Sequence, residues 1–410
     1  MPNEDRAHTD QAENRHLHSK LEVLLAFLKL GLISFGGPVA HIGYFREEFV
    51  ARRGWLDDAT YTDLVALCQF LPGPASSQVG FSIGLMRAGY LGGLAAWAGF
   101  TLPSAITLVL VALGAHSLTG PLGEGLLHGL KLVAVAIVAQ AVLGMARTLC
   151  PDGRRAAIAI LAMAVVLYGS STIAQIGVLL MGGAAGFLMC KTSALSSMHS
   201  IDVGVSRRMG IASLSVFFVL LLLLPLWHKF GAPAWIALLD AFYRSGALVF
   251  GGGHVVLPLL RDAFVAPGWV SDDKFLAGYG AAQAVPGPLF TFAAYLGAVA
   301  EPSAYGLVGA TLGLVGIFLP GMLVLVGTLP FWDMMRTRAE LQAAVRGVNA
   351  SVVGLLGAAL YSPVGTSSIT TWVDLATAVV GFLLLTYWRV RPLLVVLLGA
   401  LSGIALTQVG

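Results

Sequence analysis

The chain has 410 residues, of which 57% are hydrophobic and 11% are charged, whereas about 25% of the residues in a soluble domain are charged. With a mean hydropathy of +0.83 and a net charge of only +3, this composition excludes a soluble enzyme, a disordered protein and a nucleic-acid binder. The class that remains is an all-α polytopic membrane protein, in which runs of ~20 apolar residues span the bilayer.

The predicted elements begin after a polar tail, residues 1–20, which we expect to be disordered and cytosolic. About 13 apolar segments follow, and two of them contain a proline-rich break. Their ranges are 21–37, 61–86, 88–115, 125–148, 154–169, 172–190, 210–228, 234–252, 275–299, 304–330, 341–361, 372–388 and 392–408.

Loop charges predict the orientation, because Lys and Arg accumulate in cytosolic loops. Cations precede the first segment and lie in alternate loops, whereas the intervening loops at 116–124, 169–172, 300–304 and 361–371 contain none. Lys229 and the 253–274 connection are exceptions to this alternation. The cationic loops contain Arg147, Arg154, Arg155, Lys191, Arg207, Arg208, Arg336, Arg338, Arg389 and Arg391. This alternation predicts a cytosolic N-terminus and a periplasmic C-terminus.

The sequence also contains an internal repeat, because a series of motifs recurs in the same order 214 to 218 residues later. The matched pairs are Phe27-Leu28-Lys29-Leu30-Gly31 with Phe242-Tyr243-Arg244-Ser245-Gly246, Phe35-Gly36-Gly37 with Phe250-Gly251-Gly252, Arg46 with Arg261, Gly54-Trp55 with Gly268-Trp269, Pro72-Gly73-Pro74 with Pro286-Gly287-Pro288, Leu102-Pro103 with Leu319-Pro320, and Gly129-Leu130-Lys131 with Gly347-Val348-Asn349. We therefore divide the chain into the tail, a first repeat (21–192), a linker with an extra helix (193–233) and a second repeat (234–410).

The two repeats are predicted to be inverted relative to each other. Segment 88–115 starts beside the cytosolic Arg87, whereas its counterpart 304–330 starts after Glu301 on the outer side. The single unmatched segment, 210–228, supplies the extra crossing that inversion requires. Inverted repeats are typical of secondary transporters, which bind substrate where the repeats meet near the midplane.

Each repeat contains two breaks at which a continuous helix is not expected, because proline removes a backbone N–H and glycine accepts positive φ. Broken helices expose N–H groups that bind anions, and irregular backbone is tolerated in a bilayer where it lines a cavity. The alternative is close helix packing through small residues. The candidate substrate-binding residues at the breaks are Gly36, Gly37, Pro72, Gly73, Pro74, Gly251, Gly252, Pro286, Gly287 and Pro288.

Lys29 and Arg244 are matched cations inside apolar segments, each six residues before a Phe-Gly-Gly break. A cation within the membrane normally faces a cavity or a partner, so both are candidates for attracting an anion; the alternative is that they snorkel to the interface. Lys131 is a third candidate, and its counterpart Asn349 is a neutral one.

Gln69 and Gln283 precede the two Pro-Gly-Pro breaks by three residues, where an amide either bonds substrate oxygens or caps the freed backbone. Three titratable side chains, His41, Asp63 and His254, are candidates for proton coupling, although a structural histidine or a helix cap is the alternative in each case.

The sequence contains no cofactor signature. Cys68, Cys150 and Cys190 lack metal-ligand spacing, and no nucleotide-binding loop or haem, flavin or iron–sulfur motif is present. We therefore expect no metal and no catalytic residues, and energy supplied by an ion gradient or by the gradient of the substrate itself.

At these motifs the sequence resembles the chromate ion transporter family, in its long two-domain form. The resemblance covers about residues 21–408 and rests on Phe35-Gly36-Gly37-Pro38-Val39-Ala40-His41-Ile42-Gly43, Phe250-Gly251-Gly252-Gly253-His254-Val255-Val256-Leu257-Pro258 and both Gln-x-x-Pro-Gly-Pro motifs. It implies a multi-pass protein of the bacterial inner membrane that exports chromate, a tetrahedral dianion, and confers chromate resistance. It also implies coupling to the membrane potential or to protons, often as an antiporter.

The expected function is thus chromate efflux by alternating access, as secondary active transport of an oxyanion. A channel or uniporter for sulfate-like anions is the alternative. A membrane-embedded chromate reductase is a third hypothesis, but it needs a redox cofactor for which the sequence contains no motif. The expected partners are chromate, with sulfate as a candidate competitor, and the lipid bilayer; a homodimer is compatible with the sequence, and nucleic acid is not a partner.

Overall fold

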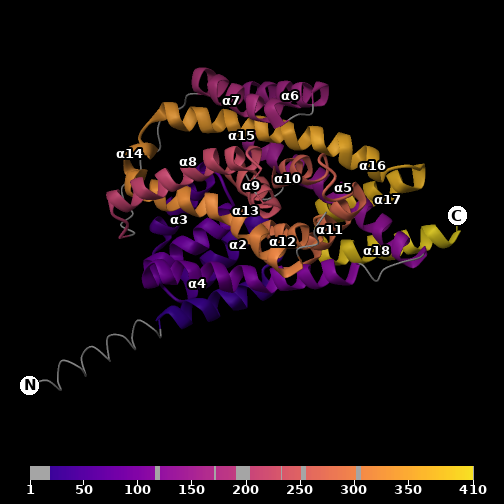
Figure 1. Ribbon diagram of the computed structural model, residues 1–410, viewed down its shortest axis with the longest axis horizontal. Coiled ribbons are helices and arrows are strands. Elements are labelled where there is room, and N and C mark those ends of the chain that lie inside the picture. Colours follow the sequence, from indigo (N-terminus) through magenta and orange to yellow (C-terminus); the bar gives the residue numbers. More distant parts are fainter. Residues whose placement is uncertain are drawn as a thin grey trace, which may run out of the picture.

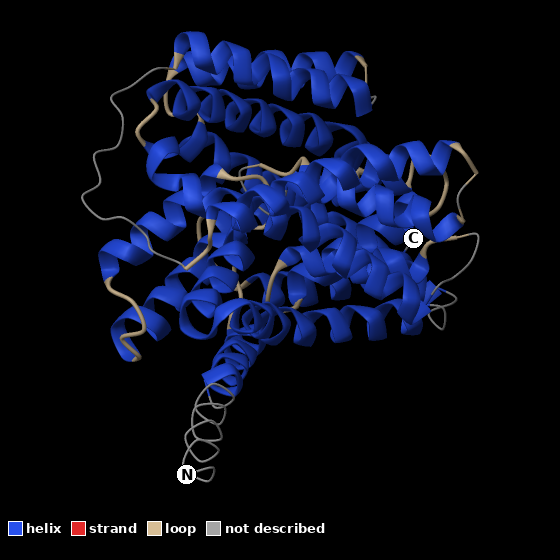
Figure 2. Ribbon diagram, turned by 60° about the vertical axis from the view of Figure 1, so that its left-hand side comes forward, coloured by secondary structure: helices blue, strands red, loops and turns tan. Residues whose placement is uncertain are grey.

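The computed structural model describes residues 19–115, 121–169, 172–190, 204–231, 233–250, 255–301 and 306–409. Within these ranges all regular secondary structure is helical (Figure 2), which confirms the all-α polytopic prediction. Five helices are long and apolar enough to cross a membrane, namely Ala75–Gly114, Leu122–Leu149, Arg207–Lys229, Gly306–Met335 and Ala339–Ser368. Further apolar helices are shorter, so the chain combines full spans with shorter elements.

The first three elements form a helical hairpin. The helix over residues 19–33 is followed by α2 (Gly37–Phe45) and the π-helix η1 (Arg46–Arg52). Lys29 pairs with Glu48 at 3.2 Å and Glu22 with Arg53 at 3.3 Å, so η1 runs back along the first helix. Phe27 stacks on Phe49 at 4.7 Å between centroids. The Phe-Gly-Gly break is the tip of this first hairpin.

A second hairpin follows, formed by α3 (Asp58–Phe70) and the beginning of α4 (Ala75–Ala115). The guanidinium of Arg87 lies over the ring of Trp55 and also pairs with Glu22 at 3.2 Å, so the chain returns to the base of the first hairpin. The Pro-Gly-Pro break is therefore the tip of the second hairpin. The chain then reverses at Gly89, where φ is 66°, and the rest of α4 forms a long helix. The predicted boundary between segments 61–86 and 88–115 is thus confirmed.

The second repeat contains the same elements in the same order. The helices are α9 (Ala234–Ala247), α10 (Val256–Phe264), α11 (Asp272–Ala284), η3 (Leu289–Thr291), α12 (Phe292–Val299) and α13 (Gly306–Thr328). Its Pro-Gly-Pro tip separates α11 from η3 and α12. Its Phe-Gly-Gly break falls between α9 and α10, where residues 251–254 lie outside the described ranges.

The tips of the hairpins meet across the two repeats. The Gly73 N–H donates to the Val249 carbonyl at 2.7 Å, and the Gly287 N–H donates to the Ser34 carbonyl at 2.9 Å. Gly73 is the repeat counterpart of Gly287, and Ser34 is the counterpart of Val249. Each Pro-Gly-Pro tip therefore bonds to the chain just before the Phe-Gly-Gly break of the other repeat.

Several of the remaining helices also pack against helices of the other repeat. They are α5 (Pro121–Leu149), α6 (Gly153–Tyr168), α7 (Thr172–Met189), α8 (Arg207–Lys229), η4 (Leu329–Phe331), α14 (Trp332–Arg336), α15 (Ala339–Ala359), η5 (Leu360–Gly365), α16 (Thr366–Ser368), α17 (Trp372–Thr386) and α18 (Pro392–Val409). In Figure 1, α6 and α7 of the first repeat lie along α15 of the second, and α18 lies beside α5. Gly186 packs against Gly347, and Gly403 packs in the same way against Gly129. The two repeats are thus interlocked over most of their length.

Candidate functional site

A cavity of about 990 Å³ lies where the two repeats meet. It is lined by the first Phe-Gly-Gly tip, the second Pro-Gly-Pro tip, α5 and the connection between α17 and α18. The main lining residues are Phe35, Gly36, Gly37, Pro38, Ala40, Ile137, Gln140, Ala282, Gln283, Val285, Gly287, Leu385, Arg389, Val390 and Arg391. Four predicted site residues, Gly36, Gly37, Gln283 and Gly287, are thus brought together although they come from both repeats.

The cavity receives the N-terminus of α2. Gly36 and Gly37 both have positive φ, at 101° and 76°, which lets the chain turn sharply into the helix. The first N–H groups of a helix have no intrahelical partner and, together with the helix dipole, favour an anion. A Cβ atom on Gly37 would meet nothing within 4 Å, so the backbone at this position is open to an approaching ion.

Two arginines that the sequence analysis used only as markers of orientation, Arg389 and Arg391, line the same cavity. Both are exposed, and neither has an ion pair within the described part of the chain. Two amides complete the polar lining: Gln140 donates to the Leu385 carbonyl at 3.3 Å, and the Gln283 Nε2 has no hydrogen-bond partner among the described residues. The cavity therefore offers cations and N–H donors without a compensating carboxylate in its lining.

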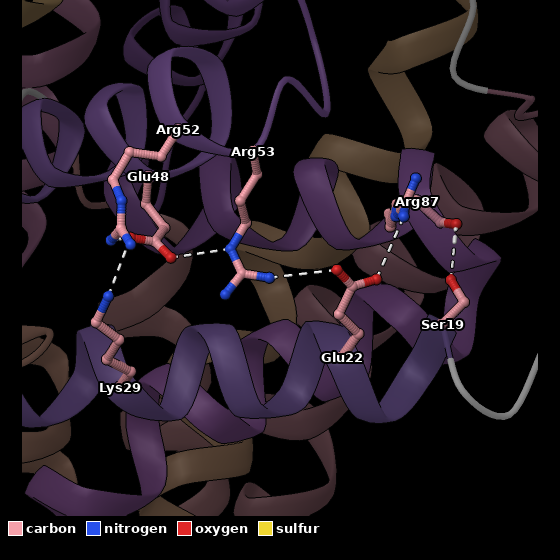
Figure 3. Close-up of polar contacts among 7 residues, drawn as sticks. All are labelled: Ser19, Glu22, Lys29, Glu48, Arg52, Arg53 and Arg87. Atoms are coloured by element: carbon pink, nitrogen blue, oxygen red, sulfur yellow. Dashed lines mark hydrogen bonds and ion pairs between the residues drawn. The ribbon is translucent and has the colours of Figure 1, made fainter.

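Lys29 does not line this cavity. It belongs to a row of alternating charges along the first hairpin, drawn in Figure 3, in which Glu48 accepts from Lys29, Arg52 and Arg53. Arg53 also pairs with Glu22, and Glu22 pairs in turn with Arg87. The Glu48 side chain is only 6% exposed, so this row fixes the two arms of the hairpin to each other.

Replacing Arg53 with alanine should lower the thermal unfolding midpoint more than replacing Lys29. Arg53 is the donor to the Glu48 Oε1, whereas Oε2 keeps Arg52 when Lys29 is removed. An unsatisfied buried oxygen costs roughly 1–3 kcal/mol, and a half-exposed ion pair contributes less than about 1 kcal/mol. Unfolding of both purified variants in the same detergent measures the difference, and equal midpoints would contradict this reading.

The other predicted cations also have carboxylate partners. Arg244 pairs with Asp240, one helical turn earlier, at 2.7 Å. Lys131 pairs with Asp273 of α11 at 2.8 Å. The Asn349 Oδ1 is buried, without a hydrogen-bond partner among the described residues. None of the three lines the large cavity.

The first Pro-Gly-Pro tip is packed into the protein rather than into the large cavity. Gly73 and Pro74 are buried, Pro72 is half-buried, and Gln69 is exposed on α3. The buried Gln78, which the sequence analysis missed, donates to the carbonyls of Pro72 and Gly321 and so caps this tip. In the second repeat Pro288 is buried and Pro286 is half-buried.

The three candidates for proton coupling do not converge. His41 is fully buried, with its Nδ1 at 3.3 Å from the Ser76 hydroxyl. Asp63 is half-buried on α3. His254 lies outside the described residues, as do Gly251 and Gly252, so the structure places none of these three.

The internal repeat relates two ion pairs of the hairpins to each other. Arg46 bonds to Asp58 at 2.6 Å, and its counterpart Arg261 bonds to Asp272 at 2.8 Å. Each pair joins the end of one hairpin to the start of the next, which positions both tips relative to each other.

Comparisons with known proteins agree with this architecture. The model of the family described as chromate transporter matches residues 21–187 and 236–404, one match in each repeat. The chain is 28% identical to the chromate transport protein of Pseudomonas aeruginosa over 93% of this chain and 91% of the relative. It is 26% identical to the chromate transport protein of Cupriavidus metallidurans over 93% and 92%.

A probable chromate transport protein of Synechococcus elongatus is 28% identical over 95% of this chain and 97% of the relative. No solved structure matches. Because the family model covers most of both repeats, the chain belongs to the chromate transporter family.

Proposed function

We propose that this protein exports chromate from the cytosol across the bacterial inner membrane by alternating access. The observation that carries the proposal is the cavity between the repeats, lined by Arg389, Arg391 and the N-terminus of α2. Chromate is a dianion, and a helix N-terminus beside two arginines without carboxylate partners complements it in charge. The relatives named for chromate transport support the choice of this anion.

In the proposed path the anion enters from the cytosol through the arginine-lined cavity and reaches the hairpin tips. Gly36, Gly37, Gln283 and Gly287 are its proposed contacts there. The loop charges support a cytosolic position for the α17–α18 connection and inverted repeats, and the exchanged bonds of Gly73 and Gly287 support a twofold relation between the repeats. Rocking of one repeat against the other around these tips is the motion expected of such transporters.

The membrane potential is a sufficient driving force for this export. Moving one charge across 100 mV is worth about 2.3 kcal/mol, so a dianion leaving an inside-negative cell gains about 4.6 kcal/mol. At about 1.4 kcal/mol for each tenfold ratio, this sustains a gradient of roughly three decades. Proton antiport would add to this force without being required by it.

Chromate uptake into inside-out vesicles tests the proposal, because export then appears as entry into the lumen. We expect saturable uptake of Cr(VI) that rises with a lumen-positive potential and is absent from vesicles lacking the protein. Uptake that is ohmic and unsaturated would favour a channel, and reduction of Cr(VI) would favour an enzyme. Uptake only in right-side-out vesicles would reverse the proposed direction.

A further inference from the structure

A second cavity, of about 380 Å³, lies mainly against the first helices of the second repeat. It is lined by α9 and α10, with Gln175 from α7 and His228 from α8. It shares no lining residue with the large cavity. Arg244, one of the cations predicted to attract an anion, lines this second cavity and does not line the large one.

The internal repeat relates three lining positions of the second cavity to lining positions of the first. Ile33 and Tyr44 line the large cavity, and their counterparts 215 residues later, Leu248 and Leu259, line the small one. Pro392 of the large cavity has Gln175 of the small one as its counterpart. The register of that last pair is set by the glycine contacts, because Gly186 packs on Gly347 as Gly403 packs on Gly129.

The chemistry of the small cavity also fits an oxyanion. The Arg244 side chain is 43% exposed and pairs with Asp240, whose side chain is 2% exposed. Gln175 is 5% exposed, and its Oε1 has no hydrogen-bond partner among the described residues. Because no hydrogen bond holds the amide oxygen, the amide can rotate and present its NH₂ group to an anion beside Arg244.

We propose that the small cavity is the exit vestibule of the transport path, in which Arg244 and Gln175 bind the tetrahedral oxyanion before release. This inference rests on the proposed function. In the described state the entry cavity is wide and the exit cavity is narrow; rocking of the repeats exchanges their sizes. The two cavities share no lining residue, so they are separate chambers of the proposed path.

The exit vestibule is more negative than the entry cavity, because Arg244 shares its lining with the carboxylates of Asp240 and Asp262. The entry arginines have no carboxylate partner, whereas Asp240 competes with the oxyanion for Arg244. His228 and Asp262 also line the exit vestibule. This competition weakens binding on the exit side, so the exported ion leaves rather than occupying the site.

Inhibition of transport by chromate on the side opposite to entry tests this assignment in proteoliposomes. Asp240→Asn should lower the trans-side inhibitory concentration about tenfold, because Arg244 loses its competitor, whereas Arg244→Gln and Gln175→Leu should each raise it about tenfold. The entry-side KM should stay within twofold of wild type in all three. Glu301→Gln, which breaks the exposed Lys274–Glu301 pair of the same repeat and lines neither cavity, is the matched control and should leave trans inhibition unchanged.

Wild-type trans inhibition in Asp240→Asn and Gln175→Leu, together with an unchanged entry-side KM, would overturn the exit vestibule. A parallel rise of both constants in Gln175→Leu would also overturn it, because a merely structural role affects both sides. If the wild-type protein shows no saturable chromate flux at all, the proposed function itself fails, and this result is distinguishable from the first two.

Discussion

Replacing Gly73 with alanine should reduce chromate transport at least 100-fold. Gly73 has a φ of 117°, which an L side chain rarely adopts, and its Cβ would lie 2.8 Å from the Cα of Gly321 and 3.0 Å from the Gln78 Nε2. The clash is with backbone, so it is relieved only if the two repeats separate. That separation breaks the bond from the Gly73 N–H to the Val249 carbonyl.

The repeat counterpart provides an internal comparison. A Cβ on Gly287 would lie 2.9 Å from the Ser104 hydroxyl and 3.3 Å from the Phe100 carbonyl, at a φ of 102°. Because the nearest atom belongs to a small side chain that has other rotamers, we expect Gly287→Ala to be the milder of the two. Both should still lower transport more than tenfold.

The matched control is Gly268→Ala. Gly268 also has a positive φ, 79°, but its Cβ would meet nothing within 4 Å. An alanine there carries a left-handed backbone strain of about 1–2 kcal/mol without the clash at the tips. Initial rates are compared at equal membrane abundance, and Gly73→Ala transporting as fast as Gly268→Ala would show that the tip contact is not needed.

Reversing the charge of both cavity arginines, as Arg389→Glu with Arg391→Glu, should lower the transport efficiency for chromate at least 100-fold. Two unit charges about 8 Å apart interact by about 0.5 kcal/mol in water. The lining changes by four charge units against a dianion, which gives about 4 kcal/mol before salt screening. The neutral Arg389→Gln/Arg391→Gln variant should lose about half of that free energy.

The effect should appear as a raised KM that shrinks at high ionic strength, because exposed charges are screened within a Debye length. Arg338→Glu is the control: this arginine is exposed at the start of α15 and lines neither cavity. Wild-type KM in the double reversal, or an equal loss in Arg338→Glu, would remove the arginines from the entry path.

Composition and the repeat could predict the class of fold and the positions of the breaks, but not where the breaks meet. The proline and glycine pattern forces the chain to turn at Pro72-Gly73-Pro74 in any fold. The bond from Gly73 to Val249 joins residues that no periodicity relates, because a repeat identifies equivalent positions and not contacts. That η1 folds back along the first helix was likewise undetermined from the sequence, and the ion pair of Lys29 with Glu48 shows it.

The partners and positions of the candidate cations could be predicted only in part, for the same reason. The partner of Arg244 lies one helical turn away and is visible in the sequence. Lys131, in contrast, pairs with Asp273, which lies 142 residues further along the chain. Arg389 and Arg391 carry no local signal that separates them from other loop arginines. Only the packing of α17 and α18 against α5 of the other repeat brings them to the cavity.

Equilibrium binding of radiolabelled chromate to the purified protein tests the central claim most directly, namely that the arginine-lined cavity holds the transported anion. We predict saturable binding to the wild type and to Arg338→Gln, and at least tenfold weaker binding to Arg389→Gln/Arg391→Gln. Wild-type affinity in that double variant, with the protein folded, would place the anion elsewhere and contradict the account.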